Sequence, residues 1–136
     1  MMRYGKRVLV VDDDERARQE TALVLEQAGF PVVQACDGLH ALSEMQKRRC
    51  DVVVTDCQMP HLNGLDFLAQ SRMIWPDTPV ILYSETRYLS DMAATRGAFA
   101  WIRKSSDSSV LLSMLAMAME LGGEWESRHA MQRVGA

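Results

Sequence analysis

The 136-residue chain is poor in cysteine, and its three cysteines follow no spacing that suggests a bridge or a metal site. Cys36, Cys50 and Cys57 are odd in number, which argues against a disulfide framework. No Cys-x-x-Cys pair is present, which argues against a zinc site. Because free thiols are typical of a reducing compartment, we expect a cytoplasmic protein.

Long apolar runs and an excess of positive charge are also missing. The longest apolar stretches, such as residues 8–11 and 52–54, are far too short to cross a bilayer. The first six residues lack the long apolar segment of a signal peptide. Lysine and arginine total 15 against 18 acidic residues, and they are scattered along the chain. We therefore expect no membrane contact and no direct nucleic-acid contact by this domain.

The chain does contain a regular alternation of short apolar strands and helical segments. The expected strands are residues 7–11, 31–35, 51–55, 80–83 and 99–102. The expected helices are residues 15–28, 38–49, 65–73, 88–95 and 106–121. This alternation predicts an α/β fold, a doubly wound five-stranded parallel sheet with helices on both faces. We assign residues 1–121 to one domain and residues 122–136 to a C-terminal tail or linker stub.

Polar side chains follow four of the five expected strands, at the sheet edge where ligands bind in doubly wound folds. They are Asp12 and Asp13 after the first strand, Asp56 after the third, Ser84 after the fourth and Lys104 after the fifth. The second strand contributes nothing obvious. Three carboxylates in one cleft repel one another unless a cation is present, and Mg²⁺ suits hard oxygen ligands and an incomplete protein cage.

The same residues form a coherent set for phosphoryl transfer. A carboxylate such as that of Asp56 can act as a nucleophile and form an aspartyl phosphate. A metal ion, the ammonium group of Lys104 and the hydroxyl of Ser84 can then neutralise the transferring group.

Several segments of the chain match a known family in order and at the family's spacing. They are Arg7-Val8-Leu9-Val10-Val11-Asp12-Asp13, Asp51-Val52-Val53-Val54-Thr55-Asp56-Cys57-Gln58-Met59-Pro60, Gly64, Val80-Ile81-Leu82-Tyr83-Ser84, and Gly97-Ala98-Phe99-Ala100-Trp101-Ile102-Arg103-Lys104. Over about residues 6–121 the chain resembles the receiver domain of two-component response regulators. The resemblance implies the flavodoxin-like strand order 2-1-3-4-5 and a phosphoacceptor signalling domain. It implies no enzyme beyond self-catalysed phosphoryl transfer and autodephosphorylation.

The resemblance also implies a role for each site residue. Asp56 would be the phosphoacceptor, and Mg²⁺ would be bound by Asp13 directly, by Asp12 partly through water, by Asp56 and by the backbone carbonyl of Gln58. Ser84 would bind a phosphoryl oxygen, and Lys104 would pair with the phosphate. Trp101 stands where the family has a Tyr or Phe that turns inward when Ser84 moves. The phosphoryl donor would be a histidine kinase or a histidine phosphotransfer protein.

The sequence departs from the family pattern at two positions. Ser105 replaces the proline that normally follows the lysine, so we expect a trans peptide bond at that position or a strained loop, since a non-proline cis bond costs about 2.5–4 kcal/mol. Trp101 is larger than the usual ring, and its simplest interpretation is an aromatic side chain half-buried at a strand edge. Cys57 is interpreted as a structural thiol.

The last helix is apolar nearly all round between residues 110 and 119, which predicts a second packing partner. A homodimer or an effector surface is the leading hypothesis, and a docked C-terminal tail is the alternative. Two alternative functions also remain. One is a degenerate receiver that binds without phosphorylation. The other, more distant, is a haloacid-dehalogenase-like phosphatase with Asp12 as nucleophile and Asp14 as acid/base, although that hypothesis leaves Asp56 unexplained.

Overall fold

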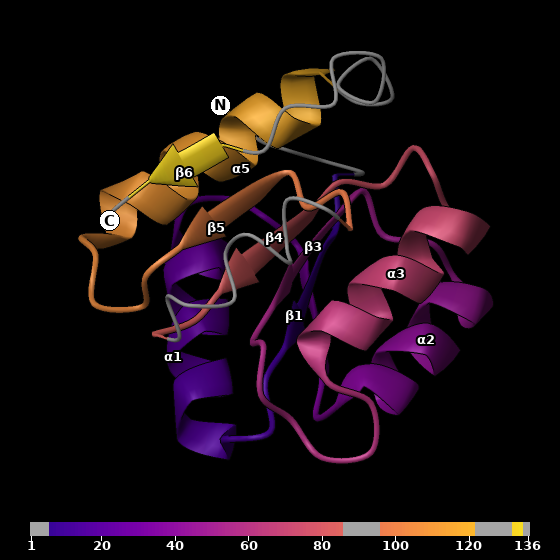
Figure 1. Cartoon of the computed structure of the whole chain (residues 1–136). Coiled ribbons are helices and arrows are strands. Elements are labelled where there is room, and N and C mark those ends of the chain that lie inside the picture. The colour runs from indigo at the N-terminus through magenta and orange to yellow at the C-terminus, as the bar shows by residue number, and fades with distance from the viewer. Residues whose placement is uncertain (1–5, 86–95, 122–131, 135–136) are drawn as a thin grey trace.

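Within residues 6–85, 96–121 and 132–134, which the computed structural model describes, the chain forms one parallel sheet with helices on both faces (Figure 1). The strands are β1 (Val8–Val11), β2 (Val32–Ala35), β3 (Val52–Thr55), β4 (Val80–Tyr83), β5 (Ala100–Ile102) and β6 (Gln132–Val134). The helices are α1 (Glu15–Gln27), α2 (Gly38–Lys47), α3 (Gly64–Ile74) and α5 (Ser108–Leu121). The helix expected over residues 88–95 lies outside the described residues.

The strand order is β2-β1-β3-β4-β5-β6, so the expected order of the first five strands is confirmed. The sixth strand lies within the residues that the sequence analysis assigned to a C-terminal tail or linker stub, for which it predicted no strand. Residues 132–134 pair in parallel with β5, with Ala100 opposite Gln132 and Ile102 opposite Val134. The outer edge of β5 offers unpaired backbone N–H and C=O groups, and a short segment with little strand pattern of its own can pair with them.

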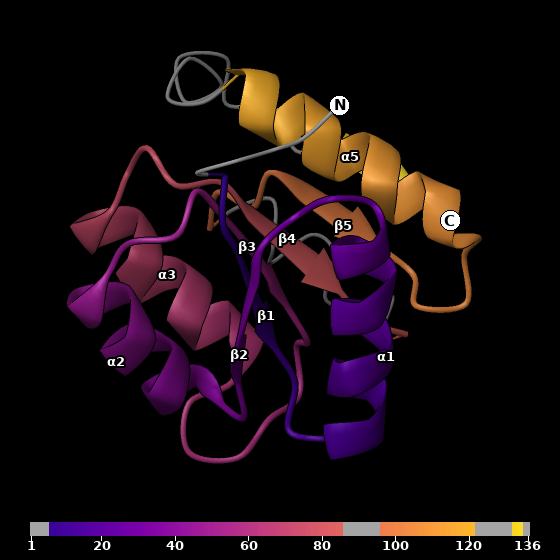
Figure 2. The same ribbon diagram turned by 180° about the vertical axis from the view of Figure 1, so that it is seen from behind.

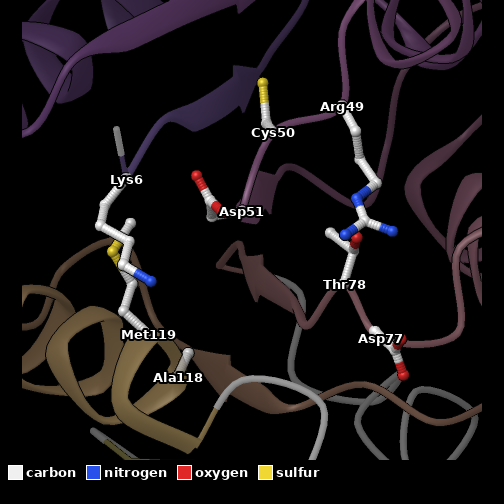
Figure 3. A pocket seen from close by; sticks show the side chains of 8 residues that line it. All are labelled: Lys6, Arg49, Cys50, Asp51, Asp77, Thr78, Ala118 and Met119. Carbon is white, nitrogen blue, oxygen red and sulfur yellow. The ribbon is translucent and has the colours of Figure 1, made fainter. Parts of the chain in front are cut away.

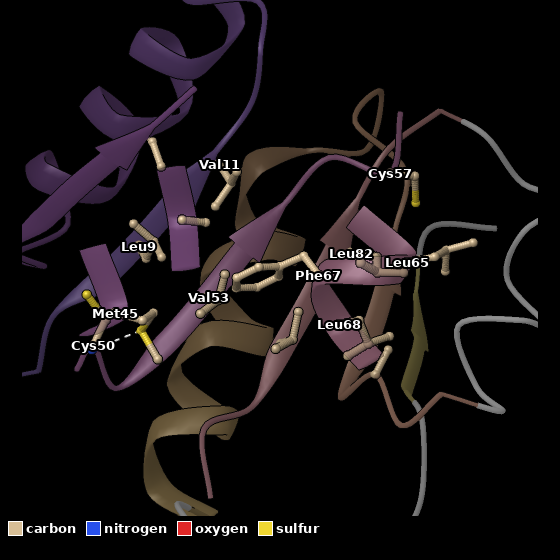
Figure 4. Close-up of a cluster of buried hydrophobic side chains, with 14 of the residues drawn as sticks. Leu9, Val11, Met45, Cys50, Val53, Cys57, Leu65, Phe67, Leu68 and Leu82 are labelled. Carbon is tan, nitrogen blue, oxygen red and sulfur yellow. Dashed lines mark hydrogen bonds between the residues drawn. The ribbon is translucent and has the colours of Figure 1, made fainter. Parts of the chain in front are cut away.

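The sheet is buried on both faces because its strands are almost wholly apolar. In β1 and β3 every residue is buried, and successive side chains point to opposite faces. Figure 2 shows α2 and α3 on one face and α1 and α5 on the other. Leu9, Val11 and Val53 pack beneath α2 and α3, where Phe67 fills the centre of the layer (Figure 4). Val8, Val10, Val52 and Val54 pack on the other face beneath α1 and α5.

Polar side chains set where the helices begin. Asp14 caps α1 by accepting a hydrogen bond from the N–H of Arg16, and Asn63 caps α3 through the N–H of Asp66. The last helix begins at Ser108 rather than at residue 106, and the Asp107 carboxylate accepts from the N–H of Ser109. None of the described helices has the length and apolar character needed to span a bilayer.

Candidate functional site

Three carboxylates meet where β1 and β3 end. These strands are neighbours in the sheet, so the loops after them start side by side. Asp12, Asp13 and Asp56 each offer one oxygen, and these oxygens all lie within 4.8 Å of one another. Asp12 is buried, Asp56 is half-buried and Asp13 is exposed, so the cluster opens to solvent on one side. A small group of carboxylate oxygens with an open side fits Mg²⁺, which keeps several waters in its coordination shell.

Lys104 reaches into the same cluster from the end of β5. Its Nζ donates to Asp12 Oδ2 at 2.6 Å and to Asp56 Oδ2 at 3.3 Å. Partial burial alone would lower the pKa of Lys104, but the hydrogen bond to Asp12 and the charge of Asp56 together raise it above its usual value. Lys104 is therefore a fixed positive charge that partly neutralises the cluster.

Backbone and side-chain contacts hold the two most buried carboxylates. Asp12 Oδ1 accepts from the N–H of Asp14 at 3.0 Å, and Asp56 Oδ1 accepts from the N–H of Cys57 at 2.7 Å. Arg18 of α1 donates to the Asp12 carbonyl oxygen at 2.9 Å and to Gln34 Oε1 of β2 at 3.1 Å. The sequence analysis missed Arg18, because an arginine in the first turns of a helix usually faces solvent.

Gly64, the first residue of α3, lets the helix start directly against the backbone of Asp56 and Cys57, just after β3. A Cβ on Gly64 would lie 2.0 Å from the carbonyl oxygen of Asp56 and 2.9 Å from the Cα of Cys57. The N–H of Gly64 donates to the Cys57 carbonyl at 2.7 Å. This close approach fixes the backbone of Asp56. Gln58, which lies between Asp56 and Gly64 in the chain, is exposed.

Ser84 lies where β4 ends, as the sequence analysis expected, and it is buried. Its backbone N–H donates to the Ile102 carbonyl at 3.0 Å, which ties the end of β4 to β5. Its side chain is hydrogen-bonded with the thiol of Cys57, the residue next to Asp56. Burial raises the pKa of Cys57 to about 11, an effect that the Ser84 hydrogen bond opposes. Cys57 is therefore a buried, unreactive thiol, which agrees with the prediction of a structural role.

The half-buried edge position expected for Trp101 is wrong. The residue is only 2% exposed, because it packs among Leu65, Leu68 and Leu82 under the helical layer. Nor is β5 an edge strand, since β6 pairs with it. The indole N–H of Trp101 finds no acceptor among the described residues. The described residues contain no cis peptide bond, which confirms the trans bond expected between Lys104 and Ser105.

The second strand, from which we expected nothing, is followed by a residue that contacts residues 56–63, the loop between β3 and α3 that begins at Asp56 and is called the acceptor loop below. Asp37, the N-cap of α2, accepts from the N–H of His40 through Oδ1, and its Oδ2 lies 2.8 Å from Nδ1 of His61. His61 belongs to residues 56–63, which connect β3 to α3. These contacts hold the pKa of Asp37 below its usual value, first through the N–H of His40 and then through His61.

A separate pocket of about 220 Å³ lies far from this cluster, where β1, β3 and β4 begin (Figure 3). Its lining mixes both signs of charge, from Lys6 and Arg49 to Asp51 and Asp77, beside the end of α5. Ligands of doubly wound sheets bind at the other edge, where the strands end. The acidic cluster is accordingly the candidate site.

Comparison with known proteins agrees with this geometry. A family model for the response regulator receiver domain matches residues 8–116. The chain is a response regulator receiver domain. The sensor kinase/phosphatase CqsS of Vibrio cholerae, which is named for the autoinducer CAI-1, is 36% identical over 119 residues, which are 84% of this chain and 17% of CqsS. This receiver domain thus spans less than a fifth of that relative.

Solved structures show the same fold. The chemotaxis response regulator CheY4 of Vibrio cholerae is 31% identical with a TM-score of 0.77, and the match covers 87% of this chain and 99% of CheY4. The response regulator TrrA of Thermotoga maritima, solved in complex with Mg(2+)-BeF, is 27% identical with a TM-score of 0.78; the match covers 83% of this chain and 98% of TrrA. The receiver family leaves the haloacid-dehalogenase-like phosphatase without support. Receiver domains are signalling domains of two-component systems and interact with histidine kinases.

Proposed function

We propose that this receiver domain accepts a phosphoryl group on Asp56 in a Mg²⁺-dependent reaction. The observation that carries the proposal is the convergence of three carboxylate oxygens within 4.8 Å, with Lys104 bonded to two of these carboxylates. Three acids that follow two strands, partly neutralised by a lysine that follows a third, can hold a metal ion and offset the charge of a transferring phosphoryl group. The Mg(2+)-BeF complex of TrrA supports the same chemistry.

Each residue has a role that follows from its position. A carboxylate oxygen of Asp56 attacks phosphorus, the bond from phosphorus to the donor's imidazole nitrogen breaks, and the nitrogen keeps the electron pair. Asp12, Asp13, Asp56 and the backbone carbonyl of Gln58 would hold Mg²⁺, which supplies positive charge to the phosphoryl oxygens when bound. Attack of water on the same phosphorus breaks its bond to the Asp56 oxygen, releases inorganic phosphate and restores the Asp56 carboxylate.

Lys104 would give up part of its present bonding to pair with the new phosphate. Its Nζ already lies between Asp12 and Asp56, so a short movement suffices. The catalytic set is thus Asp56, Lys104 and Ser84, and in these roles Asp56 and Lys104 are supported by direct contacts in the structure.

Ser84 and Trp101 would carry the switch. Ser84 must exchange its Cys57 contact for a phosphoryl oxygen, and its backbone bond to β5 links that exchange to the strand on which Trp101 lies. Trp101 is already buried, and its indole N–H has no acceptor in the part of the chain that the structure describes, which makes that position less favourable than a fully bonded one. The surface formed by β5, α5 and the helix that the sequence predicts over residues 88–95 would then report the phosphorylated state to a partner.

The partners follow from the same chemistry. The phosphoryl donor would be a histidine kinase or a histidine phosphotransfer protein, in a cytoplasmic setting consistent with three free thiols. We also propose a homodimer through α5, where Leu112, Ala116 and Met117 keep apolar surface exposed. Light scattering at high concentration, with and without beryllofluoride, tests this. Met117→Glu should abolish the dimer, and a wild type that stays monomeric in both conditions would refute it.

Intact-mass spectrometry after incubation with acetyl phosphate tests the central proposal. The wild type with Mg²⁺ should gain a single phosphoryl adduct, and the adduct should be absent from Asp56→Asn and from samples without Mg²⁺. Asp66→Asn is the matched control, because it removes an exposed carboxylate on α3, and it should be modified like the wild type. No adduct on the wild type would favour the degenerate binding module, and an adduct that survives in Asp56→Asn would refute Asp56 as the acceptor.

A further inference from the structure

The loop between β3 and α3 is fastened to the start of α2 at two points. The N–H of Gly38 donates to the Leu62 carbonyl at 3.1 Å, and His61 Nδ1 lies 2.8 Å from Asp37 Oδ2. A Cβ on Gly38 would come within 2.3 Å of the Leu62 oxygen, so only glycine permits this approach. At the lower edge of Figure 2, the loop runs beside the first turn of α2.

Residue 61 has an unusual backbone conformation. Its φ of 68° lies in the left-handed region, which a side chain with a Cβ seldom adopts. Leu62 adds a tight turn, its N–H donating to the Pro60 carbonyl at 2.8 Å. The hydrogen bond between His61 and Asp37 supports the loop in this conformation although the His61 ring is 64% exposed.

Asp37 does more than cap α2. One carboxylate oxygen accepts from the N–H of His40, as an N-cap does, and the other remains for His61. A serine or an asparagine would cap the helix equally well. The second oxygen therefore adds a side-chain contact between α2 and the acceptor loop, beside the backbone hydrogen bond from Gly38 to Leu62.

We propose that Asp37 and His61 are positioning residues that hold the acceptor loop, and so set the Mg²⁺ affinity of the acidic cluster. The proposal rests on the proposed function, because it takes Gln58 in this loop as a metal ligand. Mg²⁺ demands near-ideal octahedral geometry, and a loop that has to be ordered on binding costs affinity. The close approach of Gly64 to Asp56 already fixes the two ends of the loop. The contact between Asp37 and His61 holds its middle.

The test is a set of Mg²⁺ titrations by isothermal calorimetry on the full chain. His61→Gly removes the ring and relieves the left-handed backbone, whereas His61→Asn tolerates that backbone and keeps an N–H donor for Asp37. Asp37→Ser keeps a helix cap but loses the oxygen that reaches His61. Asp66→Ser removes one acidic charge from an exposed site on α3 and serves as the charge control.

We expect His61→Gly and Asp37→Ser each to weaken Mg²⁺ binding by about threefold or more, below the roughly 10- to 100-fold typical of groups that bond directly to metal ligands. The double variant should be no weaker than either single variant, because both remove the same contact. His61→Asn and the charge control should bind like the wild type. Phosphorylation by acetyl phosphate at saturating Mg²⁺ should not change.

A merely structural role would lower the free energy of unfolding in urea without moving the Mg²⁺ dissociation constant, and that result would overturn the proposal. Additive effects in the double variant would overturn it as well. If the wild type itself neither binds Mg²⁺ nor takes up a phosphoryl group, the proposed function fails. If the wild type does both and the variants match it, only the positioning role fails.

Discussion

Removing the Lys104 ammonium group should destabilise the metal-free protein and do so less when Mg²⁺ is present. In Lys104→Met the chain keeps a side chain of similar length but leaves Asp12 and Asp56 without their counter-charge. Removing one partner of a buried ion pair costs about 3–5 kcal/mol, and an exposed pair contributes about 0–1 kcal/mol. Lys104 is 24% exposed and Asp12 is 5% exposed, so we expect a loss of about 2–3 kcal/mol in the free energy of unfolding.

Mg²⁺ should recover part of that loss because it supplies the same positive charge. Lys104 and the ion compete for the oxygens of Asp12 and Asp56, so the variant should bind Mg²⁺ more tightly than the wild type. A tenfold gain in affinity corresponds to about 1.4 kcal/mol of extra stabilisation at saturation. The difference between variant and wild type should therefore shrink to about 1 kcal/mol in saturating Mg²⁺.

Urea unfolding at pH 7 with and without Mg²⁺ measures both values. Lys47→Met is the matched control, since Lys47 also lies 3.3 Å from a carboxylate, that of Glu44, but is 70% exposed. It should change stability by less than about 0.5 kcal/mol in either condition. The reasoning is refuted if Lys104→Met loses the same stability with and without Mg²⁺, or if it binds the ion more weakly than the wild type.

Three further predictions concern the surroundings of the cluster. Gly64→Ala should block phosphorylation and lower the free energy of unfolding, because the added Cβ would collide with the backbone oxygen of Asp56. Labelling with acetyl phosphate measures the first effect and urea unfolding the second. Labelling at the wild-type level would contradict the prediction. A thiol reagent should modify Cys36 quickly in the folded protein and Cys57 only after unfolding. Cys36 is exposed, whereas Cys57 is buried with its pKa raised to about 11. Mass spectrometry of the labelled peptides measures the order in which the two thiols are modified. Because the pKa of Asp37 is lower in the folded protein than its unfolded value near 3.9, the ionised carboxylate stabilises the fold at pH values above 3.9. This stabilisation is lost as the pH falls through the folded pKa. Asp37→Asn should accordingly be less stable than the wild type at pH 7, and the difference in the free energy of unfolding should shrink as the pH falls through the lowered pKa of Asp37. A difference that stays constant with pH would show that the charge is not involved.

The placement of the main site residues could be predicted because parallel strands end at one edge of a sheet. Asp12, Asp13, Asp56 and Lys104 each lie within two residues of the end of an apolar strand, so the parallel fold places them at the same edge. Their mutual bonding could not be predicted. The sequence analysis paired Lys104 with a future phosphate, whereas in the structure it bonds to Asp12 and Asp56, since a lone cluster of carboxylates needs a cation.

The contacts that sequence reasoning missed all join segments that no local pattern connects. The pair of Asp37 and His61 depends on a turn in the left-handed region at residue 61, which a histidine does not signal. The burial of Trp101 depends on which face of β5 lies under the helical layer, and on β6 covering the strand's edge. Three residues of strand at 132–134 are too few to show an alternation of their own.

By itself the sequence determined the alternation of strands and helices, the order of the first five strands through its family resemblance, and the residues gathered where the strands end. These are consequences of local apolar patterning and of the geometry common to parallel sheets. Only the tertiary structure decided which charges touch, which aromatic ring is buried and how the acceptor loop is fastened to α2. Such contacts depend on side chains brought together from distant positions, and their distances follow from packing that no single segment contains.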